Sequence, residues 1–81
     1  MELHTIRAGQ QYYRVDSAGT VWQVQSIFGD PNGVRHARLF NVAAPYELRT
    51  YTCSILHDNR CFRLLSEDPD HGAAIQVAHA R

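Results

Sequence analysis

Apolar and polar residues alternate along much of this chain, with the period of two that is typical of half-buried β-strands. The pattern is clearest in RTYTCSIL, where Tyr51, Cys53 and Ile55 share one face and hydroxyl side chains occupy the other. Other stretches are rich in β-branched and aromatic residues and end at turn residues. The sequence therefore predicts five strands, at residues 10–16, 20–28, 34–42, 47–56 and 60–65.

The segment Asp30-Pro31-Asn32-Gly33 carries the strongest turn signal in the chain. It places an acceptor first, a proline where φ must be near −65°, and a glycine where a positive φ is tolerated, which is the order of a type I turn followed by a bulge glycine. We expect it to join the second and third strands in a hairpin. Two loop closures are compatible with the sequence: one sets Trp22 opposite Leu39, and the other puts Phe40 and Val42 on the side of Trp22.

Two further turns divide the second half of the chain. The segment Ala43-Ala44-Pro45 interrupts the hydrogen-bond ladder between the third and fourth strands, because proline has no N–H to donate. A turn at Asp58-Asn59 is expected to join the fourth and fifth strands in a hairpin that sets Cys53 opposite Leu64 and Cys61 opposite Leu56. The two cysteines would then face opposite sides of the sheet, so we expect reduced, mostly buried thiols rather than a disulfide.

Five short strands in consecutive hairpins favour a closed sheet, because a flat sheet of this size leaves two bare edges and a half-exposed core. We expect an all-β fold, a small five-stranded SH3-like barrel over residues 9–65, in preference to an OB-like one, because the strands follow one another with short turns. Residues 66–81 are acidic and then alanine-rich, which predicts a frayed or short helical tail.

The first hairpin resembles that of a known kind of small domain. Gly9-x-x-Tyr12, Val15-Asp16 and Gly19-x-Val21-Trp22-x-Val24 are similar to the opening of SH3-like barrels of the Tudor and KOW type, over roughly residues 9–65. This resemblance implies the fold and a role as a binding module rather than an enzyme. It implies no particular ligand.

The charge balance limits the kinds of partner. The basic side chains are eight arginines, with no lysine, and eight acids balance them, so no net field attracts nucleic acid or an anionic membrane. No stretch approaches the ~18 continuous apolar residues of a membrane span. The first residues lack the positive leader and apolar run of a secretory signal. We therefore expect a cytoplasmic protein.

The residue types that usually catalyse reactions or bind metals show no motif spacing in this sequence. The five histidines are scattered and show no metal-ligand spacing. Cys53 and Ser54 fall inside a predicted strand rather than on a sharp turn, and the aspartates at positions 16, 30 and 58 occupy turn positions. No enzyme activity, cofactor or metal is expected.

Trp22 is expected to anchor the core, with its N–H bonded at the barrel wall. Surface residues that are suited to a protein or peptide partner are the polar and aromatic side chains of the sheet, because arginine and tyrosine are enriched where interfaces concentrate energy. The candidates are Tyr12, Gln23, Gln25, Arg38, Arg49 and Tyr51. An open barrel edge offers a second route, through an added strand.

The alternative function is weak binding of single-stranded nucleic acid. Arginines would contact phosphates while tyrosine or tryptophan stacks on bases. The arginines concerned are at positions 14, 35, 38, 49, 60 and 63. The neutral overall charge disfavours this alternative.

Overall fold

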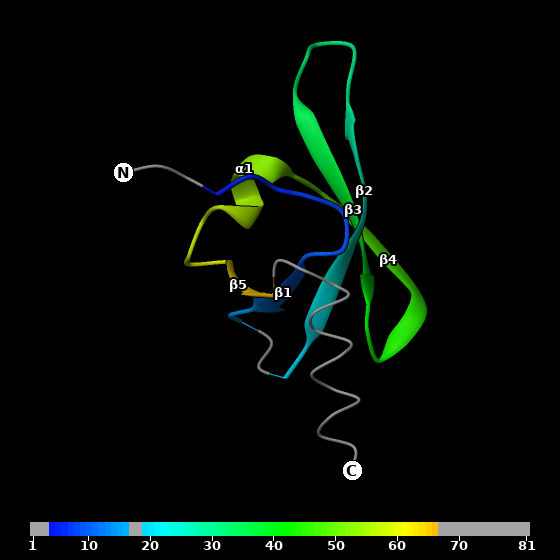
Figure 1. The fold of residues 1–81 in the computed structure, drawn as a ribbon, viewed down its shortest axis with the longest axis vertical. Coiled ribbons are helices and arrows are strands. Elements are labelled where there is room, and N and C mark those ends of the chain that lie inside the picture. The colour runs from blue at the N-terminus through cyan, green and yellow to red at the C-terminus, as the bar shows by residue number, and fades with distance from the viewer. Residues whose placement is uncertain (1–3, 17–18, 67–81) are drawn as a thin grey trace.

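The computed structural model describes residues 4–16 and 19–66. It shows five antiparallel strands in one sheet with one short helix (Figure 1). The elements are β1 (Gln11–Arg14), β2 (Val21–Gly29), β3 (Arg35–Asn41), β4 (Ala44–Thr52), α1 (Cys53–Leu56) and β5 (Phe62–Ser66). The expectation of a mostly β fold is confirmed.

The strands lie in the order β4-β3-β2-β1-β5, so β4 and β5 are the two edges of the sheet. The sheet is open, since no ladder of hydrogen bonds joins β4 to β5 within residues 4–16 and 19–66. The short helix α1 carries the chain from one edge to the other (Figure 1). Among the described residues, no helix is long and apolar enough to cross a membrane.

The predicted hairpin of the fourth and fifth strands is wrong. The fourth strand ends at Thr52, α1 follows, and β5 pairs with β1, with Tyr12 opposite Leu64. A helical turn replaces the last part of the alternating segment because it turns Leu56 into the core, where 1% of its surface is exposed. Strand alternation alone does not distinguish this arrangement from a longer β4, because the choice depends on which edge β5 joins.

The ladder between the third and fourth strands is interrupted at Pro45, as the sequence predicts, and it resumes where Phe40 pairs with Leu48. The strand itself begins earlier than predicted, at Ala44. Val42 and Ala43 form the turn, Asn41 pairs with Ala44, and β4 already contains Pro45. Proline is tolerated there because residues 45–47 have no partner in β3, so the missing N–H leaves no ladder bond unmade.

The turn between β2 and β3 is confirmed. The Gly33 N–H donates to the Asp30 carbonyl at 2.9 Å, and Gly33 has the positive φ of 83° that the bulge position requires. The Asp30 carboxylate also accepts the backbone N–H groups of Asn32 and Val34, each at 2.9 Å. The turn projects beyond the other elements at the end of the long hairpin (Figure 1).

The register of this hairpin differs from both expected closures. Trp22 pairs with Asn41 and Val24 with Leu39, and a bulge at Gln25 shifts the ladder before Ser26. The bulge adds a residue to β2, which neither closure includes. As a result Leu39, rather than Phe40, shares the buried face with Trp22.

The hydrophobic core is formed by side chains of β1, β2, β3, β5 and α1, together with Ile6. Trp22 belongs to it with 4% of its surface exposed, as expected for a core anchor. The expectation for its N–H is wrong, because Nε1 has no hydrogen-bond partner among the described residues. The buried apolar residues are Ile6, Tyr12, Trp22, Val24, Ala37, Leu39, Leu56 and Phe62.

A buried amide fixes the segment before β1 on this core. Gln10 is fully buried; its Oε1 accepts the Arg7 backbone N–H and the Tyr12 hydroxyl, each at 2.8 Å, and its Nε2 donates to the Thr5 carbonyl at 2.7 Å. Residues before the predicted domain boundary at residue 9, among them Ile6, therefore pack on the core. The tail predicted after residue 66 lies outside the described residues.

Candidate functional site

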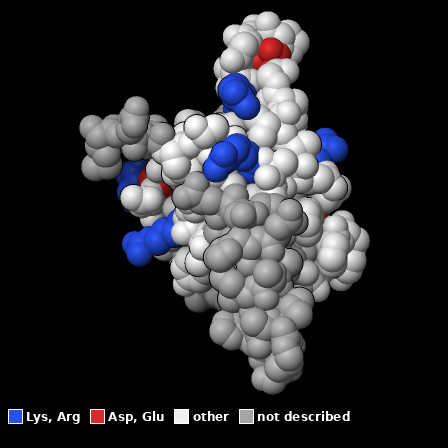
Figure 2. Space-filling view, in the orientation of Figure 1, with Lys and Arg blue, Asp and Glu red and all other residues white. Residues whose placement is uncertain are grey.

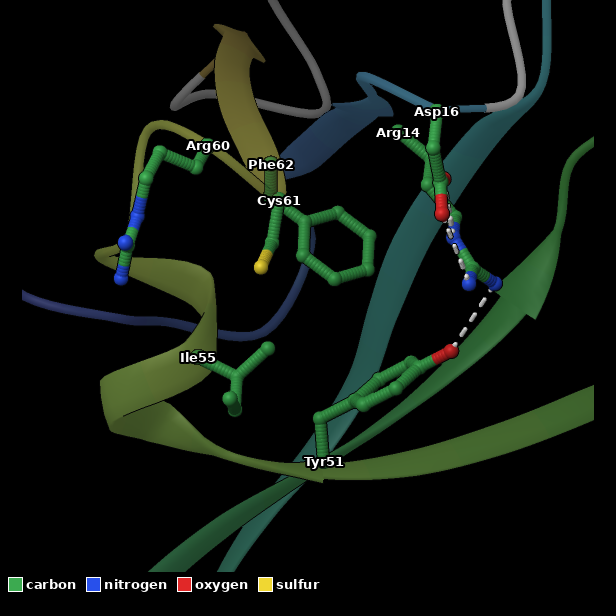
Figure 3. A pocket seen from close by; sticks show the side chains of 7 residues that line it. All are labelled: Arg14, Asp16, Tyr51, Ile55, Arg60, Cys61 and Phe62. Atoms are coloured by element: carbon green, nitrogen blue, oxygen red, sulfur yellow. Dashed lines mark hydrogen bonds and ion pairs between the residues drawn. The ribbon is translucent and has the colours of Figure 1, made fainter.

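A cavity with a volume of about 250 Å³ lies between the two edges of the sheet, next to α1. Figure 3 shows side chains from β1, β4, α1 and the start of β5 around it. The lining residues are Arg14, Asp16, Tyr51, Ile55, Arg60, Cys61 and Phe62. We call this cavity the seam pocket.

The floor of the seam pocket is apolar. Tyr51 faces inward from β4 opposite the small, fully buried Ala37, which leaves its ring free to lean toward Phe62. The two rings meet edge to face, with centroids 5.2 Å apart. Ile55 reaches in from α1, which places an aliphatic side chain beside the aromatic pair (Figure 3). The floor is therefore suited to an apolar group.

One side of the pocket rim is formed by the guanidinium of Arg14, from β1. Arg14 Nε donates to Asp16 Oδ1 at 2.7 Å, and Nη1 donates to the Tyr51 hydroxyl at 3.2 Å (Figure 3). The hydrogen bond to Asp16 raises the pKa of Arg14 above its ordinary value. Arg14 is thus a fixed cation that links β1 to β4.

The opposite rim carries a second arginine–aspartate pair. Arg60 Nη2 donates to Asp58 Oδ2 at 2.9 Å, and its side chain is 90% exposed. These hydrogen bonds lower the pKa of Asp58 and raise that of Arg60. In Figure 3 the arginines lie on opposite sides of the pocket, with Phe62 and Cys61 between them. The rim therefore offers guanidinium donors at both ends.

The structure divides the predicted partner-binding residues between two faces and the core. Tyr12 is fully buried, so it belongs to the core rather than to a binding surface. Gln23 and Arg38 face the outer side of the sheet, and Gln25 is exposed in the bulge. Tyr51 alone of the six lines the seam pocket.

Arg49 lies on the inner side of β4, away from Gln23 and Arg38. Its guanidinium carbon is 5.5 Å from the centroid of the Trp22 ring, and Nη2 is 3.6 Å from Glu47 Oε2. The outer face is less polar than expected, because Phe40 pairs with Gln23 on one side and with Leu48 on the other. The predicted groove is therefore not one surface.

Sequence reasoning missed Arg14, Ile55 and Phe62 as pocket residues. These three side chains meet at the pocket only because β1 pairs with β5 and because α1 turns the chain, and neither feature has a local sequence signal. A partial signal existed for Arg14: it is two residues from Tyr12 and so shares the core face of β1. A charged residue on a core face needs partners, and Arg14 finds Asp16 and Tyr51.

A second cavity of about 190 Å³ is lined by His4, Thr5, Ile6, Arg35, Cys53 and His57. His57 Nε2 donates to the His4 carbonyl at 2.7 Å, and the two imidazole rings meet edge to face at 4.9 Å. Burial raises the pKa of the Cys53 thiol, which disfavours the nucleophilic thiolate. Cys53 and Cys61 are both free thiols. Within the described part of the chain, no three His, Cys, Asp or Glu side chains are grouped to hold a metal.

Comparisons of the chain with models of protein families, with curated proteins and with solved structures found no match. The functional argument therefore depends on the geometry of the seam pocket and of the sheet surface.

Proposed function

We propose that this chain is a small non-enzymatic interaction module, of SH3-like type, that binds a short peptide segment of a partner protein at the seam pocket. The observation that carries the proposal is an apolar cavity of about 250 Å³ with a guanidinium at each end. Small-molecule and cofactor sites usually span roughly 300 to 1,000 Å³. A cavity below that range suits one anchor side chain of a peptide.

The floor determines the anchor. Tyr51, Ile55 and Phe62 present aromatic and aliphatic surface, so a leucine- or phenylalanine-sized side chain is the best fit. Burial of such a side chain contributes about 1.5 to 3 kcal/mol relative to exposure. That gain alone gives weak binding, because association also loses translational and rotational freedom. Contacts of the peptide at the rim are therefore part of the site.

The rim determines what accompanies the anchor. Arg14 is held in place by Asp16 and Tyr51, and its guanidinium has further N–H donors that can reach a carboxylate or a backbone carbonyl. Arg60 supplies the same chemistry at the other end of the pocket. The proposed ligand is therefore an apolar residue followed by an acidic one.

The SH3-like type is supported by the run of five antiparallel strands and by the approach of its two edges. Tyr51 of the edge strand β4 contacts Phe62 of the edge strand β5 and accepts a hydrogen bond from Arg14 of β1. These contacts fold the open sheet over its core. The seam pocket is the space left beside them.

The test uses three capped dipeptides as probes: acetyl-Leu-Glu-amide, acetyl-Ser-Glu-amide and acetyl-Leu-Gln-amide. Titrations followed by amide chemical shifts should place the leucine probe at Tyr51, Ile55 and Cys61. We expect the serine probe to bind about tenfold more weakly, because it loses the apolar burial. The glutamine probe should also be weaker, since it loses a charge-assisted hydrogen bond.

The two half-buried cysteines provide matched variants. Cys61→Met fills the seam pocket, whereas Cys53→Met adds the same atoms beside the second cavity. We expect the first substitution to abolish the shifts caused by the leucine probe and the second to leave them unchanged. Equal binding of the leucine and serine probes, or equal effects of the two variants, would contradict the proposal.

The structure gives less support to the nucleic-acid alternative. Arg14, Arg49 and Arg60 are each within 3.6 Å of a carboxylate, which leaves N–H donors for a single carboxylate but reduces the positive field that a run of phosphates would meet. On the face in Figure 2 the arginine side chains lie apart from one another rather than along one track. Proteins that bind single strands use a continuous positively charged groove.

A further inference from the structure

The edge strand β4 exposes a long run of main chain. It has nine residues, Ala44–Thr52, and nothing in residues 4–16 and 19–66 pairs with its outer side. An edge strand presents unpaired N–H and C=O groups that can bind another strand. Apolar side chains accompany it, since Tyr46 is 88% exposed and Leu48 is 44% exposed. This edge is suited to an added strand.

Only the first part of β4 is protected against such pairing. Pro45 removes one donor, and residues 45–47 have no partner in β3, because the ladder passes from the Asn41–Ala44 pair directly to the Phe40–Leu48 pair. From Tyr46 to Thr52 the strand contains neither proline nor glycine. Within this stretch the residues from Leu48 to Thr52 pair regularly with β3, and Tyr46 and Glu47 extend the strand beyond that ladder. The regular part is as long as an ordinary strand of a globular protein.

The charges of β4 identify the partner. Glu47 and Arg49 are two residues apart, so they lie on the same face of the strand, one on each side of Leu48. When a strand is read in the opposite direction, this order becomes cation, apolar residue, anion. An antiparallel copy of the same strand is therefore complementary to it in charge.

The register between the two β4 strands decides whether opposite charges face each other. In a continuous antiparallel sheet of two copies, residues that face each other must lie on the same face, so the central registers are those centred on residue 47, 48 or 49. Centring on Glu47 or on Arg49 sets identical charges opposite each other, which is destabilising. Centring on Leu48 sets Glu47 of each copy opposite Arg49 of the other.

We propose that two copies of this chain associate through their β4 edges in the register centred on Leu48. The two-fold axis then passes beside Leu48, and each Glu47–Arg49 contact occurs twice. Tyr46 lies opposite Thr50 of the second copy, a pairing of types that favour strands. The five-stranded sheets become one continuous sheet across the interface.

Both charged side chains are already held in place in the single chain. Asn41 Nδ2 donates to Glu47 Oε1 at 2.7 Å, and the Arg49 guanidinium lies over the Trp22 ring. In the single chain Arg49 also donates to the Leu48 carbonyl at 2.8 Å and lies 3.6 Å from Glu47 Oε2, so the contact with the second copy extends an ion pair that already exists. Side chains that are fixed before association lose less conformational entropy when they pair. Leu48 does not line the seam pocket, so this proposal does not depend on the peptide-binding function.

The experiment measures oligomeric state by sedimentation velocity from micromolar to millimolar concentration. We expect the native chain to dimerise and Glu47→Arg or Arg49→Glu to raise the dimer dissociation constant by about tenfold or more, because each sets like charges opposite each other twice. An equimolar mixture of the two variants restores opposite charges and should form a mixed dimer. The double variant Glu47→Arg, Arg49→Glu should dimerise as the native chain does.

Arg63→Glu is the matched control, because Arg63 is an exposed arginine on the other edge strand, β5. It should leave dimerisation unchanged. Circular dichroism of each variant establishes that it is folded. A native chain that stays monomeric at millimolar concentration, single variants that dimerise like the native chain, or a mixture that remains monomeric would each overturn the proposal.

Discussion

Trp22 combines deep burial with an indole N–H that has no acceptor among the described residues. An unsatisfied buried donor costs about 1 to 3 kcal/mol, so the N–H opposes folding. The ring favours folding, because its apolar area is buried and because the Arg49 guanidinium lies 5.5 Å from its centroid. The ring of Trp22 therefore stabilises the fold, and its polar atom does not.

This balance gives a prediction for two substitutions of Trp22. Trp22→Ala should lower the free energy of unfolding by about 3 to 5 kcal/mol, since it removes the ring and leaves a cavity. Trp22→Phe keeps an aromatic ring and removes the unsatisfied N–H, so it should cost less than half as much. Urea unfolding of the native chain and both variants measures the difference. A phenylalanine variant as unstable as the alanine variant would show that the N–H is satisfied.

At the scale of elements, the β2–β3 hairpin depends on one glycine. Gly33 adopts a φ of 83°, and a Cβ built there would have no atom within 4 Å. Gly29, near the end of β2, has the same open surroundings, and its φ is outside the range that disfavours side chains. An added Cβ meets no steric contact at either position, so a difference between alanine substitutions at Gly33 and Gly29 reports backbone strain at Gly33.

We expect Gly33→Ala to destabilise the protein by about 1 to 2 kcal/mol, because an L-residue is strained at this φ. Gly29→Ala should be neutral or stabilise by up to about 1 kcal/mol, since alanine loses less backbone entropy in a strand. Thermal unfolding of both variants checks the contrast. Similar melting temperatures for the two would mean that the turn rearranges.

The turn between α1 and β5 depends on Asp58. Its carboxylate accepts the Arg60 backbone N–H at 3.0 Å and the Arg60 guanidinium at 2.9 Å, and its carbonyl accepts the N–H groups of Cys61 and Phe62. The hydrogen bonds from Arg60 lower the pKa of Asp58 in the folded state. The turn is therefore coupled to pH.

A lowered pKa in the folded state stabilises the protein at pH values above the ordinary aspartate pKa of about 3.9. That contribution is lost as the pH falls through the lowered pKa. Asp58→Asn retains an acceptor for the backbone N–H and removes the charge. Its melting temperature should therefore lie below that of the native chain at neutral pH and approach it in acid. A gap independent of pH would exclude the ion pair as its cause.

At the scale of the whole molecule, the charge is balanced and dispersed. The chain has eight arginines and eight acidic residues, and three ion pairs join an arginine to an acidic residue in the described part of the chain. Surface ion pairs of this kind contribute little to stability. Their main effect is to reduce the positive field that a nucleic acid would meet.

We therefore expect a labelled single-stranded oligonucleotide to bind negligibly, even at low salt. Fluorescence anisotropy at two salt concentrations is the measurement. Phosphate contacts release counterions, so genuine nucleic-acid binding would give an affinity that falls steeply with salt. Tight binding with such a slope would restore the nucleic-acid alternative.

The sequence by itself determined the features that depend on neighbouring residues. Alternation located the strands, the Asp30–Gly33 order located the turn, and a lone tryptophan in an alternating strand indicated a core anchor. These follow from the pleat of a strand and the φ preferences of proline and glycine, which act over a few residues.

Only the tertiary structure decided which edges meet and what lies between them. The alternation in 47–56 continues to Leu56, but the chain turns into α1 at Cys53 because β5 pairs with β1. The seam pocket follows from that pairing, since it brings Arg14 to Tyr51 across 37 positions of sequence. No local pattern encodes such a contact, because its free energy arises from burial that exists only after the strands have assembled.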